Sequence, residues 1–148
     1  MGARPLAASF VALTALACSI EQPVSGPVSL TTEWKAVDPP EPLRVGPKEQ
    51  QEVCLQVVGT TTDVDFEKGR LLVNGQWHVL GGEAVDNEQK KHDLRIGSLG
   101  GDTVCLYRAG EPVSGPDFDP DLTIISLRLR SDPPLQLQQV RWLSHDQK

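Results

Sequence analysis

The chain has few of the residue types from which binding and catalytic sites are commonly built. Its 148 residues include three histidines, three cysteines, one tyrosine, three phenylalanines and three tryptophans. After residue 17 there is no apolar run near the eighteen residues that suggest a membrane-spanning helix. Acidic residues outnumber basic ones by 20 to 14, and no long basic stretch occurs. This balance argues against nucleic acid or anionic lipid as a partner.

Catalytic signatures are also absent from the sequence. The three histidines, His78, His92 and His145, lie far apart and show no metal-ligand spacing. Neither Cys54 nor Cys105 stands in a recognisable local motif with histidine or asparagine, as a catalytic thiol would. We therefore expect a protein that is not an enzyme and that needs no cofactor, calcium being the one cation considered below.

The N-terminal segment is the most informative part of the sequence. Arg4 precedes about a dozen residues without a charge, which is typical of a secretory signal peptide and too short to span a bilayer. Ala15-Leu16-Ala17 provides a small-x-small cleavage site immediately before Cys18. We therefore predict that residues 1–17 are a signal peptide and that the exported chain begins at Cys18.

The same boundary, Thr14-Ala15-Leu16-Ala17-Cys18, resembles a bacterial lipobox in a permissive form, with Ala15 and Leu16 in the reverse of the preferred order. The resemblance to bacterial lipoprotein precursors implies a thioether-linked diacylglycerol on Cys18 and a third acyl chain on its amine. Ser19 in the next position implies sorting to the outer membrane. The expected location is therefore the cell envelope, anchored by lipid and facing the periplasm or the exterior. Ordinary cleavage, which would give a freely secreted protein, is the alternative.

The other two cysteines are expected to form one disulfide. Once Cys18 is assigned to the lipid, Cys54 and Cys105 remain as a pair in an oxidising compartment. Both occur in the sequence Val-Cys-Leu, within segments that have strand character. Valine and leucine would lie on one face of each strand and cysteine on the other, so neighbouring strands would bring both sulfurs to one side of a sheet. Two buried free thiols are the alternative.

Hydrophobic periodicity predicts an all-β fold, an antiparallel β-sandwich of about eight short strands. Residues 18–28 are small, polar and proline-bearing, and we expect them to form a flexible tether. Residues 29–148 are expected to form the sandwich domain. The predicted strands are Ser29 to Trp34, Glu52 to Val58, Arg70 to Val73, Gln76 to Leu80, His92 to Ile96, Thr103 to Arg108, Leu122 to Arg130 and Leu135 to Leu143.

The clearest local unit is a hairpin closed by Asn74-Gly75, because both positions of a type I′ turn need a positive φ. Two-residue closure predicts the pairs Leu72–Trp77 and Leu71–His78. We expect the face with Leu72, Trp77 and Val79 to lie toward the core, and His78 to point the other way.

Two other segments give local predictions. In the last strand the apolar phase changes between Leu137 and Val140, which predicts a bulge near Gln138 and Gln139. Residues 83–91 have a helix-compatible composition, and a short helical turn or an exposed loop fits them equally well.

Two features are candidates for ligand binding. Trp34 lies between Glu33 and Lys35 and could be an exposed platform for a sugar ring, whereas Trp77 and Trp142 are expected in the core. The carboxylates of Asp117, Asp119 and Asp121 alternate along the chain, as the oxygen ligands of calcium loops do. The EF-hand glycine and glutamate are missing, so a solvated acidic turn is the alternative for this segment.

Together these features predict a non-catalytic envelope lipoprotein that serves as a protein-binding, assembly or structural module. A carbohydrate-binding or calcium-stabilised β-sandwich module is the alternative.

Overall fold

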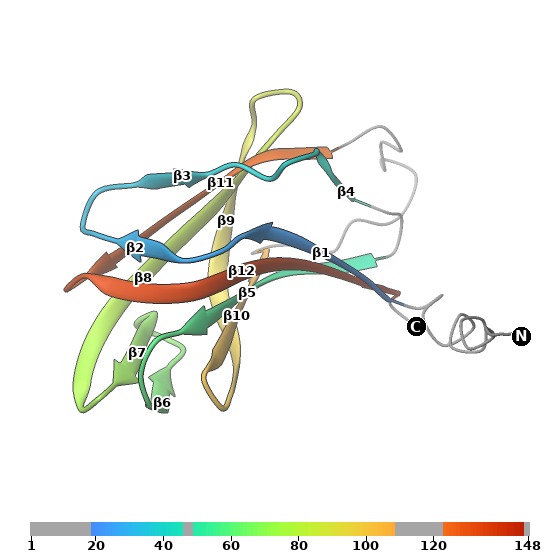
Figure 1. Cartoon of the computed structure of the whole chain (residues 1–148). Coiled ribbons are helices and arrows are strands. Elements are labelled where there is room, and N and C mark those ends of the chain that lie inside the picture. Colours follow the sequence, from blue (N-terminus) through green and yellow to red (C-terminus); the bar gives the residue numbers. More distant parts are fainter. Residues whose placement is uncertain (1–18, 46–48, 109–122, 147–148) are drawn as a thin grey trace, which may run out of the picture.

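The computed structural model describes residues 19–45, 49–108 and 123–146 (Figure 1). Within these ranges the regular elements are β-strands in one antiparallel sheet, and none of the described residues forms a helix long and apolar enough to cross a bilayer. The expected all-β antiparallel fold with one disulfide is therefore confirmed. The described residues form twelve strands instead of about eight. These are β1 (Ser19–Ser25), β2 (Val28–Leu30), β3 (Lys35–Val37), β4 (Leu43–Arg44), β5 (Glu49–Val57), β6 (Thr61–Asp65), β7 (Arg70–Val73), β8 (Gln76–Asp86), β9 (Lys91–Gly100), β10 (Thr103–Arg108), β11 (Thr123–Asp132) and β12 (Leu135–Asp146).

One N-terminal segment holds both edges of this sheet. The central order is β12-β5-β10-β9-β8-β11; β1 and β2 pair with β12, and β3 and β4 pair with β11. The connection between β2 and β3 also joins the two edges, because the Ser131 N–H donates a hydrogen bond to the Thr31 carbonyl at 2.8 Å. The sheet therefore curls until its edges approach each other, which gives the nearly barrel-like shape in Figure 1.

The expectation of a flexible tether over residues 18–28 is wrong for most of its length. Residues 19–25 form β1, which is paired with β12 from Ser19 opposite His145 onward, and β2 begins at Val28. Small polar residues and proline are compatible with this strand because β1 lies at an edge, where the ladder is needed on one side only. Val24 supplies a buried apolar anchor.

The inward face of the sheet is apolar and closely packed. Leu55, Val104 and Leu127 are fully buried on three different strands, and Trp142 lies in the core as expected. The predicted bulge in β12 is confirmed, because the register with β5 shifts between Leu137 and Gln139. This extra residue lets the apolar side chains on both sides of the bulge point inward.

The predicted β7–β8 hairpin has the expected register but the opposite orientation. Asn74 has φ 49° and Gly75 has φ 79°, as the turn requires, and Leu71 lies opposite His78. His78 is buried with 5% of its surface exposed, whereas Val79 is 49% exposed, so the predicted core face was wrong. The burial of His78 is accommodated because its Nδ1–H donates to the Pro133 carbonyl at 2.9 Å.

Residues 83–91 were expected to form a helical turn or a loop, and only the loop is present in part. β8 continues to Asp86, β9 starts at Lys91, and the loop is limited to residues 87–90. Ala84 is buried and packs in the core, and this tertiary contact outweighs the helical propensity of the segment.

The predicted disulfide joins the two strands at the middle of the sheet. Cys54 on β5 lies directly opposite Cys105 on β10, with an S–S distance of 2.06 Å and a Cα–Cα distance of 4.1 Å. Both sulfurs lie on the outer face, because Val53 and Leu106, which are next to the cysteines in their strands and opposite each other, are buried in the core. On the chain-entropy model, a cross-link that closes a loop of 51 residues contributes about 4 kcal/mol to stability.

Two adjacent glycines in β8 provide a test of this packing. A Cβ on Gly82 would lie 2.9 Å from Leu106 Cδ1 and 3.3 Å from Leu94 Cβ in the core. We expect Gly82→Ala to lower the free energy of unfolding by about 1–3 kcal/mol, because the core cannot accept the extra methyl group. Gly81→Ala is the matched control: its Cβ would meet the Arg130 side chain on the outer face, and we expect a change within about 0.5 kcal/mol. Urea denaturation of both variants measures the difference, and equal stabilities would contradict the assigned faces.

Candidate functional site

The main candidate site lies where β8 changes its hydrogen-bonding partner. Along one edge β8 pairs with β11 throughout residues 79–86. Along the other edge its first part pairs with β7, up to Val79 opposite Arg70, and its later part pairs with β9, from Gly82 opposite Leu94. β7 and β9 therefore diverge beside Leu80 and Gly81. We call the depression at this position the fork groove.

The fork groove has a volume of about 530 Å³, which is in the range of small-molecule sites. Its floor consists of strand backbone and of core side chains reached from outside, and its walls come from the β2–β3 connection, the β6–β7 turn, β9 and β11. The lining residues are Trp34, Phe66, Glu67, Lys68, Gly69, Leu80, Gly81, Gly82, Asp93, Leu94, Arg95, Ile96 and Arg130.

Two exposed aromatic side chains line the groove. Trp34 is 40% exposed, and the Arg130 guanidinium lies over its ring at 4.4 Å from the ring centroid. Phe66, in the turn between β6 and β7, is 53% exposed. The two rings come from opposite sides of β8, because Arg130 is paired with Gly81 on the β11 edge and the β6–β7 hairpin joins the other edge. Gly81 keeps the floor between them open: a Cβ there would lie 3.4 Å from Trp34.

The turn that carries Phe66 is fixed by Asp65. Its carboxylate accepts hydrogen bonds from the Lys68 N–H at 3.1 Å and from Arg70 at 3.1 Å, and these bonds hold the pKa of Asp65 below its usual value. Gly69 closes the turn with φ 64°, and its carbonyl accepts a hydrogen bond from the Leu80 N–H. Phe66 is therefore presented by a structured turn.

The rim of the groove combines acidic and basic groups. Asp93 and Arg95 on β9 form an exposed ion pair at 3.1 Å, and Glu67 and Lys68 lie in the β6–β7 turn. With Arg130, the rim offers both hydrogen-bond acceptors and donors around a floor of strand backbone and apolar side chains. Such a surface suits an amphipathic ligand without a large net charge.

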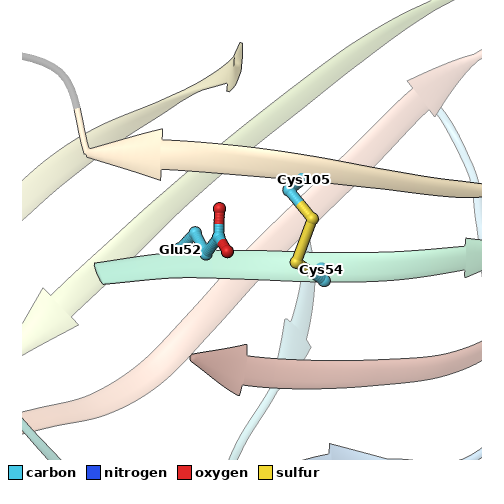
Figure 2. Close-up of side chains that lie close together, drawn as sticks. All are labelled: Glu52, Cys54 and Cys105. Carbon is cyan, nitrogen blue, oxygen red and sulfur yellow. A yellow bond between two sulfur atoms is a disulfide. The ribbon is translucent and has the colours of Figure 1, made fainter. Parts of the chain in front are cut away.

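A second cluster surrounds the disulfide. A carboxylate and two sulfurs lie within 4.8 Å of one another here, from Glu52, Cys54 and Cys105. Figure 2 shows the Glu52 side chain next to the bridge. These are metal-ligand types, but the sulfurs are bonded to each other and offer no thiolate. A hydrogen bond to Glu52, with burial, raises the pKa of Tyr107, whose ring lies across Gly97. The cluster therefore supports the middle of the sheet.

The buried pair of Asp86 and His92 resembles part of a catalytic site but holds a loop in place. His92 Nε2 lies 2.8 Å from Asp86 Oδ2. The other carboxylate oxygen accepts the N–H groups of Glu88 at 2.8 Å and Lys90 at 2.9 Å, and Asp86 is only 1% exposed. The two N–H bonds fix the loop over residues 87–90 and the contact with His92 joins it to β9, which explains why a carboxylate is buried here.

Of the residues that the sequence singled out, Trp34 lies in the fork groove and Cys54 and Cys105 form the disulfide. Cys18 and the acidic run Asp117, Asp119 and Asp121 lie outside the described residues. Phe66, Gly81 and Arg130 were not predicted as site residues, because they come together only in the folded sheet. The consecutive glycines at 81 and 82 were the available signal, since glycine within a strand marks close approach by another group.

The role of Asp86 can be tested by Asp86→Asn, with unfolding measured as a function of pH. Burial of the carboxylate raises its pKa. The hydrogen bonds from His92, Lys90 and Glu88 together lower the pKa by more than burial raises it, so the pKa of Asp86 lies below 3.8. Its stabilisation is therefore fully present above about pH 4 and is lost as the pH falls through the lower folded value. We expect the variant to be less stable by about 1–3 kcal/mol at pH 7. A difference that persists unchanged at pH 2 would contradict this assignment.

Comparison with known proteins gives no match: no protein family model, no curated protein and no solved structure is significantly similar to this chain.

Proposed function

We propose that this protein is an exported, non-catalytic binding module of the cell envelope, and that it binds its ligand in the fork groove. The observation that carries the proposal is the groove itself. It combines a floor of strand backbone and apolar side chains, two exposed aromatic residues and a rim of mixed charge in one depression of about 530 Å³. This combination is typical of a binding site.

Two features support export. The uncharged run that ends at Cys18 has the layout of a signal peptide. The Cys54–Cys105 disulfide is of the kind that persists in oxidising compartments and is rare in the cytosol.

The position of β1 gives the proposed anchor a direction. β1 begins at Ser19, the residue after Cys18, and its first residue lies beside the end of β12. The other end of β12 lies at the far end of the molecule, where it pairs with β2 (Figure 1). Trp34 follows shortly after β2 in the chain. About ten residues of strand separate these ends, a distance of roughly 30 Å. A lipid on Cys18 would therefore hold the domain with Trp34 directed away from the membrane.

The non-catalytic assignment is supported by how several reactive groups of the described residues are used. Cys54 and Cys105 are bonded to each other, so neither is an available nucleophile. The Asp86–His92 pair stabilises a loop, and Asp93 and Arg95 neutralise each other at the groove rim.

The anchor is tested by mass spectrometry of the mature N-terminus of the exported protein. We expect a first residue of Cys18 whose mass includes a diacylglycerol and a third acyl chain. A Cys18→Ser precursor is the control and should yield no lipidated product. A mature chain with an unmodified Cys18, or one that retains Met1, would contradict the proposed anchoring.

The groove is tested with envelope fragments from cells that produce the protein natively. We expect saturable co-sedimentation of the purified exported protein, and a loss of affinity of about ten-fold or more in Gly81→Leu, because a leucine there fills the floor between the two rings. Gly100→Leu is the matched control, since a Cβ on Gly100 meets nothing within 4 Å. Thermal melting should be similar in the two variants. Equal retention of the wild type and Gly81→Leu would contradict binding through the fork groove.

A further inference from the structure

We infer that the ligand of the fork groove is a neutral sugar ring of an envelope glycan. The inference rests on the proposed function, which assigns binding to this groove, and it adds the chemical class of the ligand. Three properties of the groove support it: its aromatic surface, the balance of charges on its rim, and the hydrogen bonding of its floor.

The aromatic surface suits the C–H face of a pyranose. Sugar rings present axial C–H bonds on a face and hydroxyl groups around their edge, and the positively polarised C–H groups pack on the negative face of an aromatic ring. Trp34 and Phe66 carry such rings, are 40% and 53% exposed, and lie on either side of Gly81. The Arg130 guanidinium over the Trp34 ring fixes that ring in position, which lowers the conformational entropy lost on binding.

The rim suits hydroxyl groups, which both donate and accept hydrogen bonds. Asp93 and Glu67 are acceptors, and Lys68, Arg95 and Arg130 are donors. Two carboxylates and three cations lie around one small depression, and Asp93 and Arg95 pair with each other, so the net charge that a ligand meets is small. A phosphate-rich ligand would meet two carboxylates here, and a basic peptide would meet three cations.

The floor is unsuited to an added peptide strand. A peptide that extends a sheet needs an open row of backbone groups along a strand edge. At the groove β8 is hydrogen-bonded on both edges, through the pairing of Gly81 with Arg130 on β11 and through the Leu80 N–H, which donates to the Gly69 carbonyl at 2.9 Å. Contacts to a ligand here come mainly from side chains, as they do for a sugar stacked on an aromatic ring.

The test uses the same envelope fragments after two treatments. Periodate cleaves the vicinal diols of sugar rings and leaves most polypeptide intact, whereas protease does the reverse. We expect periodate to abolish the co-sedimentation that depends on Gly81, and protease to leave it unchanged.

In untreated fragments, Trp34→Ala should weaken binding about ten-fold or more, and Trp34→Phe should retain most of it. Trp77→Ala is the matched control, because Trp77 also lies under an arginine, Arg70 at 4.6 Å, but is not part of the groove.

A neutral sugar also predicts the response to salt. Raising the salt concentration from 50 to 500 mM, a range over which charge pairing is strongly screened, should change the affinity by less than about three-fold.

Three results would overturn the sugar assignment, and the first two concern the chemistry of the ligand. Loss of Gly81-dependent binding after protease but not after periodate would show a polypeptide ligand, and a steep fall in affinity with salt would show an ionic one. In both cases the proposed function would stand, because the wild type would still bind through the groove. Equal binding by Gly81→Leu and the wild type would instead contradict the proposed function itself. Unchanged binding by Trp34→Ala would show that the ligand does not stack on Trp34, and this result would also overturn the inference.

Discussion

A β-strand can hydrogen-bond to only one neighbour on each edge at a given position, and this limit determines the shape of the candidate site. β8 uses one edge for β11 along most of its length and divides the other between β7 and β9. The two partners must separate where one replaces the other. The backbone at this point is Gly81-Gly82, so no side chain fills the resulting space, and the groove follows from the pairing of the sheet.

Local chemistry made part of the structure predictable. The register of the β7–β8 hairpin follows from the positive φ that Asn74 and Gly75 supply, and the bulge in β12 follows from a phase change between apolar residues. The disulfide followed from matching strand phases around Cys54 and Cys105. In each case the determining residues are close in sequence, or their side chains follow the regular alternation between the two faces of a strand.

Other features depend on contacts between distant segments, which explains the errors. The inward face of the hairpin is set by the long strand β8, whose Leu80 and Ala84 are in the core; this places His78 inside and leaves Val79 exposed. The tether prediction failed because β12, more than a hundred residues away, supplies a partner for β1. The groove combines residues of five segments, so the aromatic platform at Trp34 could be suspected but its neighbours Phe66 and Arg130 could not.

The pairing of the first strands with the last also determines when the chain can fold. β1 and β2 have β12 as their partner, and β3 and β4 have β11, so the N-terminal quarter has no sheet to join until the C-terminal strands are present. Contacts of such long sequence separation form slowly, because the loop must close before they stabilise the chain. In a polypeptide that emerges N-terminus first, β1 to β4 therefore stay without their sheet partners until the last two strands arrive, whereas β5 to β10 can pair among themselves earlier.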